Sequence, residues 1–526
     1  MSVKRTWSNL ALAAYVRVIR NAPRSVVCNG SLFASSLIFA SSAIPMTWDQ
    51  GAGAVVPSLP GFQHHFNISS GSNPGQIRNF VSLVYIGYAI GSALSFFIND
   101  HVGRLWSYRV YLFIWLIGQL TAISTPGISG LWASRIISGM GIGGLSVSGP
   151  MSLAEIAPTE IRGLLTSWFV VAMGISLFTA NFCTLGVYLH VPISRLQYQI
   201  VFFAPCIFMA LCVICSFFVC ESPRWLMIAE RRKEAEDTLS KLRGLPLDHP
   251  RVQGEIRDIE ASISLVGGSE KPTLLELVKE TFTKRSNLRR VQQTLMSYAL
   301  AQLSGANSIT SYFVPYMQII SPGGGTTRNM FLSGMYGFSK FWFSLIASFL
   351  FIDALGRRNS LFIGAFLQMV SDIYIGVFIK YQQVQTMSKT ASEAAVGMLF
   401  VHAFGYSVGL LTLPYVFGGE LWPNRIRSFG GALSQTFHWL FIYAVKFSIP
   451  SLLKNTDNWG AFIFFAGWCF IAIVYVFLVV PEVAGLSVEE IEEVFKGPWF
   501  NAYKRSKRSL VRGEVGNLDG HKHDLS

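Results

Sequence analysis

Uninterrupted apolar runs of close to 20 residues constrain this chain more than any other feature of its sequence. Two clear examples occupy 200–220 and 461–480. A helix rises 1.5 Å per residue, so about 20 residues cross a hydrocarbon layer of about 30 Å. Only 13% of the 526 residues are charged, about half of the roughly 25% found in soluble domains. These features predict an all-α membrane protein and argue against a soluble enzyme, a nucleic-acid binder or a secreted disulfide scaffold.

The apolar runs predict twelve transmembrane helices in two groups of six. We expect the first six near 30–55, 77–98, 108–125, 130–153, 163–187 and 198–220, and the second six near 292–318, 330–352, 359–380, 395–419, 429–450 and 460–480. The polar segment between the groups is typical of short amphipathic helices. The predicted organisation is an N-terminal segment (1–29), a six-helix half (30–220), a helical linker (221–290), a second six-helix half (291–480) and a tail (481–526).

The net charge of +13 is concentrated on one side of the expected bundle. Basic residues precede the first span and follow the last: Lys4, Arg5, Arg17, Arg20, Arg24, Lys504, Arg505, Lys507, Arg508 and Arg512. The segments expected on the other side contain almost none, since 56–77 has no Lys or Arg and 321–329 has only Arg328. The positive-inside rule therefore places both termini and the linker in the cytoplasm of a multi-pass protein. The charge reports topology and attraction to membrane lipids, not a nucleic-acid partner.

Short charged motifs recur between the two halves at nearly constant spacing. Asp100–Arg104 after the second span matches Asp353–Arg357 after the eighth, and Glu155–Arg162 after the fourth matches Glu420–Arg427 after the tenth. Glu221 and Glu482 close the sixth and twelfth spans. A six-helix unit repeated about an axis along the membrane normal is typical of transporters.

The same motifs contain a candidate cytoplasmic gate. Glycine permits a tight reversal between helices, and the arginines can reach carboxylates on neighbouring helices. The candidate gate residues are Asp100, Arg104, Glu155, Arg162 and Glu221 in the first half, and Asp353, Arg357, Glu420 and Arg427 in the second. The alternative is that the bases only orient the chain in the membrane, but orientation alone does not require acids at fixed positions beside them.

These motifs, taken in order, resemble those of a known family. Further matching segments are Trp48–Gly51, Arg135–Gly143, Glu221–Arg224, Gln302–Asn307 and Pro481–Ser487. Along nearly its whole length the chain resembles the sugar porter family of the major facilitator superfamily, most closely its fungal branch. The resemblance implies the major facilitator fold and alternating access around a central carbohydrate site. It also implies that the coupling ion is a proton or that there is none.

Two other motifs have simpler interpretations. Gly139, Gly141 and Gly144 fit a dinucleotide-binding spacing, but they lie inside an apolar span without a preceding strand. Gly139 and Gly143 share one helix face, which predicts close approach of two membrane helices. Asn67 begins a glycosylation acceptor, Asn-Ile-Ser, on the expected outer loop.

Two ionisable residues at membrane depth are candidates for proton coupling. Asp49 lies in the first span and Arg135 in the fourth, and such groups are costly enough in a membrane to indicate function. The resemblance implies that the matching pair opens when the acid takes up a proton. A guanidinium beside the carboxylate favours its ionised form, so substrate and proton together could release Arg135. The alternative is a static structural ion pair.

The candidate substrate site lies in the seventh span. Gln302 and Asn307 are five residues apart, so both face one cavity only if the helix is broken or tilted, which Gly305 would permit. Side-chain amides donate and accept hydrogen bonds as sugar hydroxyls do. The aromatic residues Tyr312, Tyr415 and Trp439 are candidate walls of the site, with lipid-facing or core packing as the alternative.

The chain departs from the family pattern in ways that affect the substrate. Ala301, Val170 and Ile442 stand where the family usually has polar residues. Lys446 lies in the eleventh span and could bind a carboxylate, which favours a uronate or quinate; alternatively it reaches to the outer interface. Asp372, His402 and His438 also lie in apolar spans, and Lys340 is a candidate partner for Asp372.

We therefore predict a secondary active transporter that moves a monosaccharide or sugar-like acid inward together with a proton. The alternatives are a quinate- or galacturonate-type acid as the true substrate, a passive facilitator, and a non-transporting nutrient sensor. We expect no enzyme activity, cofactor or metal site, because the sequence contains no metal-ligand cluster, no positioned nucleophile and no phosphate loop. The expected partners are the substrate, a proton and membrane lipids. The expected state is a monomer in the plasma membrane, with a vacuolar membrane as the alternative.

Overall fold

The fold is helical throughout the part of the chain that the structure describes. The computed structural model describes residues 23–68, 74–266, 273–347, 357–385, 387–411, 422 and 424–480. Within these ranges there are α-helices and short 3-10 turns but no strands, which confirms the predicted all-α architecture. Eight of the described helical stretches are long and apolar enough to cross a membrane.

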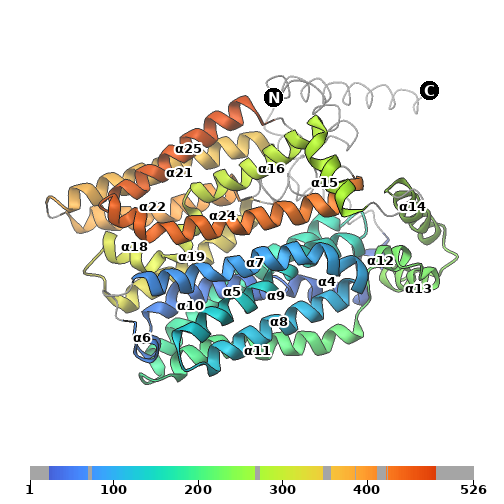
Figure 1. Ribbon diagram of the computed structural model, residues 1–526, viewed down its shortest axis with the longest axis horizontal. Coiled ribbons are helices and arrows are strands. Elements are labelled where there is room, and N and C mark those ends of the chain that lie inside the picture. Colours follow the sequence, from blue (N-terminus) through green and yellow to red (C-terminus); the bar gives the residue numbers. More distant parts are fainter. Residues whose placement is uncertain are drawn as a thin grey trace.

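Two groups of long helices correspond to the two halves of the sequence. The first half contains α4 (Gly30–Ser41), α5 (Ile44–Val55), α7 (Pro74–Val102), α8 (Arg104–Ser124), α9 (Ile128–Ile156), α10 (Arg162–His190) and α11 (Leu196–Cys215). The second contains α16 (Arg285–Leu303), α17 (Ala306–Ser311), α18 (Phe313–Ile320), α19 (Gly325–Ile346), α21 (Arg357–Gln382), α22 (Lys389–Val408), α24 (Arg427–Asn455) and α25 (Trp459–Leu478). In Figure 1 the first half lies below, in blue and cyan, and the second lies above, in yellow to red.

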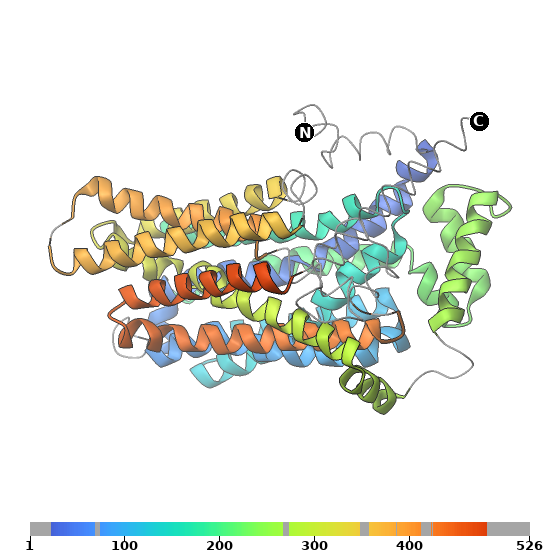
Figure 2. The same cartoon turned by 90° about the horizontal axis from the view of Figure 1, so that it is seen from above.

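Short helices mark the two ends of the bundle. Between the halves the chain forms α12 (Pro223–Ile228), α13 (Arg232–Arg243), α14 (Pro250–Val266) and α15 (Leu274–Thr283). Figures 1 and 2 show α12, α13 and α14 together at one end, which we call the linker end. The opposite end, where α6 (Pro60–Phe66) and α18 lie, is called the loop end.

Local sequence signals explain where helices begin and end. The side chain of Asn29 accepts a hydrogen bond from the N–H of Ser31 at 2.9 Å and so caps the start of α4. Between α7 and α8 the chain reverses at Gly103, whose φ is +98°. A Cβ at this position would lie 3.0 Å from both the Glu221 carboxylate and the Trp225 ring. The reversal therefore requires glycine for its conformation and for its space.

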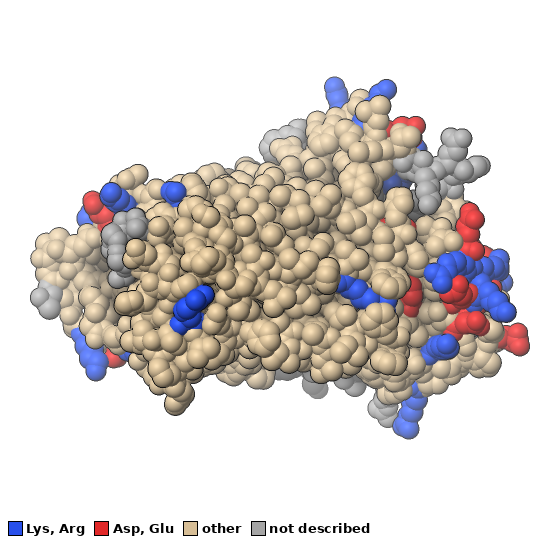
Figure 3. All heavy atoms as spheres, turned by 60° about the horizontal axis from the view of Figure 1, so that its bottom comes forward, with Lys and Arg blue, Asp and Glu red and all other residues tan. Residues whose placement is uncertain are grey.

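The surface of the bundle is divided into charged ends and an uncharged middle. In Figure 3 most Lys, Arg, Asp and Glu side chains gather at the two ends of the long axis, with a broad band between them that carries few. Large apolar side chains such as Phe113, Phe203 and Phe477 are exposed. An exposed apolar band of this kind is favourable only against lipid.

Glycines bring α7 and α9 into backbone contact. A Cβ on Gly139 would lie 2.2 Å from the carbonyl oxygen of Val84, and a Cβ on Gly143 would lie 2.1 Å from that of Tyr88. On the facing helix, a Cβ on Gly87 would lie 2.2 Å from the carbonyl oxygen of Ile136. The packing role predicted for Gly139 and Gly143 is confirmed, and this contact gives α9 a fixed position against α7.

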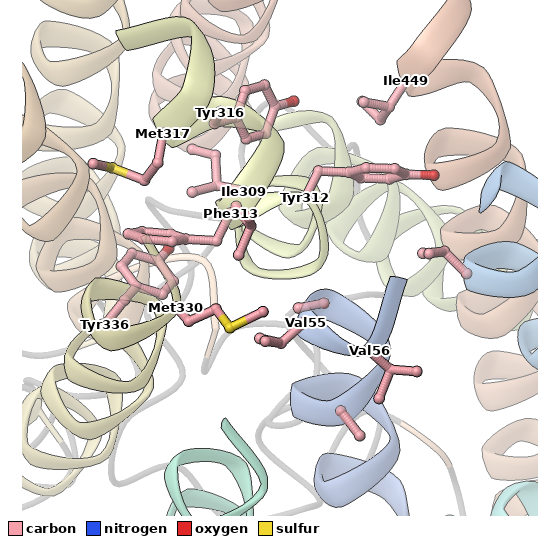
Figure 4. Close-up of a cluster of buried hydrophobic side chains, with 14 of the residues drawn as sticks. Val55, Val56, Ile309, Tyr312, Phe313, Tyr316, Met317, Met330, Tyr336 and Ile449 are labelled. Carbon is pink, nitrogen blue, oxygen red and sulfur yellow. The ribbon is translucent and has the colours of Figure 1, made fainter. Parts of the chain in front are cut away.

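The two halves touch through apolar side chains at both ends of the bundle. At the loop end, Val55 and Val56 of the first half belong to the same buried cluster as Tyr312, Phe313 and Met330 of the second (Figure 4). At the linker end, the rings of Phe96 and Phe429 meet with centroids 5.8 Å apart. Between these two contacts lies a buried polar region contributed by both halves.

The glycine contact yields a first prediction. Replacing Gly139 by Ala should destabilise the protein by about 1–3 kcal/mol, because overpacking forces two helices apart. The control is Gly467→Ala on α25, where an added Cβ meets nothing within 4 Å and alanine adds helix propensity. The midpoint of thermal unfolding in detergent measures both. A Gly139→Ala variant that melts with or above the control would contradict the account of this contact.

Candidate functional site

The seventh span is interrupted where the sequence predicts a break. Helix α16 ends at Leu303 and α17 begins at Ala306, with Gly305 between them at a φ of +82°. A Cβ on Gly305 would lie 2.7 Å from the ring of Phe465 on α25, so glycine is required here for space as well. The break turns Gln302 and Asn307 toward each other.

These two amides form a hydrogen-bonded group with residues of both halves. The Asn307 side-chain amide donates to the Gln302 side-chain oxygen at 2.8 Å and to the Tyr406 hydroxyl on α22 at 3.4 Å. Gln50, on α5 of the first half, donates to the Asn307 side-chain oxygen at 3.4 Å. Sequence reasoning missed Gln50 and Tyr406 as members of the site, although Gln50 lies inside the motif Trp48–Gly51.

Asp49 and Arg135 form a buried ion pair in the first half. They lie on α5 and α9, and each side chain is 3% exposed. One guanidinium nitrogen lies 3.0 Å from Asp49 Oδ2 and another contacts Oδ1, which makes the pair bidentate. Arg135 Nε also donates to the carbonyl oxygen of Phe80 at 2.9 Å. The pair is thus held in one geometry away from water.

Lys446 is buried at the contact between α24 and α7. Its Nζ is 2.5 Å from the hydroxyl of Tyr85 and 2.5 Å from that of Ser311, and the residue is 1% exposed. The alternative in which this side chain reaches to the outer interface is therefore wrong. Both partners are neutral, and no carboxylate of the described residues forms an ion pair with it. Ser311, which the ammonium group contacts, lies one helical turn after Asn307 on α17. Lys446 and the amide group therefore lie against the same face of α17.

Two of the three candidate aromatic walls contact either Lys446 or its partner Tyr85. The Tyr312 hydroxyl donates to the Lys446 carbonyl oxygen at 3.1 Å. The Trp439 ring stacks on Tyr85 with centroids 6.1 Å apart and meets Tyr88 edge-on at 4.7 Å. Both wall residues are buried and neither faces lipid. Tyr415 lies outside the described residues.

The proposed pairing of Lys340 with Asp372 is not found. Lys340 Nζ donates to the hydroxyl of Thr310 at 2.9 Å, and it lies above the Tyr406 ring at 5.3 Å. Asp372 instead lies beside His402, with 3.4 Å between Oδ2 and Nε2. Which side chains meet between two helices depends on how each helix is rotated about its own axis. A single sequence does not specify that rotation.

Four of the five candidate gate residues of the first half, Asp100, Arg104, Glu155 and Glu221, converge at the linker end. Arg104 is 2.9 Å from a Glu155 oxygen and 2.8 Å from an Asp100 oxygen. The Glu221 carboxylate accepts the backbone N–H groups of Arg104 and Leu105. Burial raises the pKa of Glu221, although these N–H groups act in the opposite direction. The cluster ties α7, α8 and α9 to the start of the linker.

The other candidate gate residues are not part of this cluster. Arg162 is exposed at the start of α10, and no ion pair joins it to a described residue. Asp353 and Glu420 lie outside the described residues, as do the side chains of Arg357 and Arg427. Within the described residues the cluster joins helices of one half and does not bridge the two.

Two remaining expectations concern other parts of the chain. Asn67 is exposed and ends α6 in a left-handed conformation with φ of 54°. Among the described residues no group of three His, Cys, Asp or Glu side chains could hold a metal ion.

Comparison with known proteins is consistent with this geometry. A family model described as sugar (and other) transporter matches residues 36–495. The quinate permease of Emericella nidulans is 27% identical over 509 residues, which cover 94% of each chain. The low-affinity glucose transporter HXT1 of Saccharomyces cerevisiae is 30% identical over 462 residues, covering 84% of this chain and 77% of that one. These relatives are named as a permease and a transporter, not as enzymes.

Solved structures show the same fold. The xylose transporter XylE from E. coli in an inward-open conformation aligns with a TM-score of 0.71 and 20% identity, over 88% of this chain and 99% of that one. XylE described as a proton:xylose symporter, bound to 6-bromo-6-deoxy-D-glucose, aligns with a TM-score of 0.72 and 21% identity, over the same shares. The predicted twelve-helix architecture in two halves is confirmed, and the chain belongs to the sugar porter family of the major facilitator superfamily.

Proposed function

We propose that this protein carries a monosaccharide or a sugar-like acid into the cytoplasm together with a proton, by alternating access. The observation that carries the proposal is the buried bidentate pair of Asp49 and Arg135. A pair of this kind is poor evidence for stability, because desolvation offsets much of its attraction. Its place beside a polar centre shared by both halves supports a role in coupling.

The coupling step follows from charge. Protonation of Asp49 removes the negative partner and leaves Arg135 as an uncompensated buried cation, which costs about 3–5 kcal/mol. That free energy is large enough to shift an equilibrium between two arrangements of the halves by more than a factor of 100. A rearrangement that gives the Arg135 guanidinium new hydrogen-bond acceptors or water would then lower this free-energy cost. A passive facilitator has no need of such a pair.

The substrate would bind where the two halves contribute polar groups. Gln302 and Asn307 offer both donors and acceptors, as polyol recognition requires, and Gln50 reaches the same point from the first half. The Tyr312 and Trp439 rings adjoin this region. A ligand bridging the halves would favour one of their relative tilts, which is the thermodynamic requirement for alternating access.

A second candidate substrate class is favoured by Lys446. Its ammonium group is buried with two neutral hydroxyl partners, and the nearby Asp49 carboxylate is already paired with Arg135. A substrate carboxylate would supply a direct negative partner. Of the two relatives described above, one is named for quinate, which carries a carboxylate, and one for glucose, which does not. A quinate- or galacturonate-type acid is therefore the alternative to a neutral monosaccharide.

The proton role of Asp49 predicts a split between two transport modes. Asp49→Asn should abolish accumulation driven by a pH gradient in proteoliposomes, while exchange of internal for external substrate continues, because the neutral amide cannot carry the proton. The matched control is Asp258→Asn on the exposed face of α14. If Asp49→Asn still concentrates substrate against its gradient, the proposed coupling is wrong.

The amide group predicts an effect on apparent affinity. Gln302→Ala and Asn307→Ala should each raise the half-saturation concentration about tenfold. Each variant leaves a buried hydroxyl of the bound substrate without its hydrogen-bond partner, at a cost of about 1–3 kcal/mol. Gln293→Ala serves as control, because Gln293 is buried on the same helix α16 more than two turns away. Unchanged half-saturation in both site variants would remove them from the binding site.

The two substrate classes are separated by Lys446→Met. For an acidic substrate, the variant should raise the half-saturation concentration for quinate or galacturonate about 10- to 100-fold, because a charged hydrogen bond is lost. Uptake of D-glucose should change little. Lys380→Met on α21 is the control, since that ammonium group is exposed and lies over the Trp459 ring, away from these partners. A wild-type protein that transports D-glucose and neither acid would decide for the neutral class.

A further inference from the structure

The second half contains a buried acid and base that the proposed transport cycle does not use. Asp372 on α21 and His402 on α22 are both 0% exposed, and Asp372 Oδ2 lies 3.4 Å from His402 Nε2. The His402 contact is long for a hydrogen bond, and neither oxygen of the Asp372 carboxyl has another hydrogen-bond partner among the described residues. An ionised carboxylate with so little hydrogen bonding is very unfavourable in such a place, so this geometry favours a neutral carboxylic acid.

The contacts of His402 indicate its tautomer. Nε2 is 3.0 Å from the carbonyl oxygen of Ser304, which can only accept, and 3.4 Å from the side-chain nitrogen of Gln368. The carbonyl oxygen is the nearer of the two, so we place the ring proton on Nε2. Nδ1 has no hydrogen-bond partner among the described residues, as expected for a neutral imidazole. Gln368 on α21 donates to the Ser304 hydroxyl at 3.1 Å. The His402 imidazole thus binds the Ser304 carbonyl, and the Gln368 amide binds the Ser304 hydroxyl. Together the two side chains hold the end of α16 in place.

Ser304 stands at the point where the seventh span breaks. It caps α16 and directly precedes Gly305, and Gln302 and Asn307 lie on either side of it. Whatever moves Ser304 therefore changes how the two amides of the proposed substrate site face each other.

We propose that Asp372 and His402 form a second proton-binding site, which sets substrate affinity through Ser304. With Asp372 protonated, the His402 N–H donates to the Ser304 carbonyl, and the interruption between α16 and α17 keeps the conformation described above. When Asp372 loses its proton, the new carboxylate competes for that same N–H, and the Ser304 carbonyl loses its donor. The proton bound here stays in the second half and sets affinity, whereas the transported proton is the one at Asp49. This inference rests on the proposed substrate site.

The surroundings contain few other groups that could account for such a titration. The titratable residues that face Asp372 from the neighbouring helices are His402 of α22, Tyr316 of α18, Tyr336 of α19 and Cys469 of α25. Phenols and thiols are neutral near physiological pH. The nearby cation on α19, Lys340, donates to Thr310.

The test measures substrate affinity against pH in the Asp49→Asn variant, which removes the transported proton. The probe is D-glucose or quinate, whichever the wild-type protein exchanges, with equal pH on both sides of the membrane. Half-saturation for exchange should rise about tenfold between about pH 5 and 8. Adding Asp372→Asn, which mimics the protonated acid, should leave high affinity at every pH, and adding His402→Gln should also remove the pH dependence.

A control variant and an infrared measurement complete this test. Ser371→Ala alters a buried neighbour on α21 whose hydroxyl donates only to its own helix at Leu367, and it should keep the pH dependence. If the Asp372 variant does not fold, infrared spectra of the Asp49→Asn protein should still show a buried carboxylic-acid band that disappears as pH rises, and absence of that band refutes the site. A flat profile in Asp49→Asn, or a slope that survives Asp372→Asn, also overturns the inference. Accumulation by Asp49→Asn would instead refute the coupling proposal.

Discussion

The buried attraction between Asp49 and Arg135 is the interaction on which the proposed mechanism depends. Neither charge is stable alone at this depth, because desolvation is expensive and few hydrogen bonds replace water. The carbonyl of Phe80 gives the guanidinium one acceptor besides the carboxylate, which is too little to hold it without Asp49. Adding a proton to a single carboxyl group therefore creates a large imbalance, and only a change in the surrounding helices can remove it.

In the proposed mechanism, contacts between helices transmit that local imbalance from the first half to the second. Close glycine contacts hold α9, which carries Arg135, against α7, and α7 in turn carries Tyr85, which meets Lys446 of the second half. The polar centre lies between apolar contacts at both ends, around Val55 and Met330 at one and Phe96 and Phe429 at the other. Opening either end requires these contacts to separate while the centre keeps its ligand, as alternating access demands.

Sequence reasoning succeeded where local chemistry decides the outcome. Apolar runs predict helices, and the spacing of Gln302, Gly305 and Asn307 predicts a broken one. It failed where the partner lies on another helix, because rotation about each helix axis is set by packing across the whole bundle. The sequence therefore does not decide between the two environments of Lys446, and it makes Lys340 a candidate partner for Asp372, which lies beside His402 instead. Asp353, Glu420, Tyr415 and the side chains of Arg357 and Arg427 lie outside the described part of the structure, so their roles stay predictions.

Proton movement itself tests the central claim most directly. Proteoliposomes containing a pH-sensitive dye inside, without an imposed gradient, should acidify steadily when substrate is added outside to the wild-type protein. The same preparation with Asn at position 49 should exchange labelled substrate but show no sustained acidification. Steady acidification by that variant, or none by a wild-type protein that takes up substrate, would contradict the role given to the buried pair.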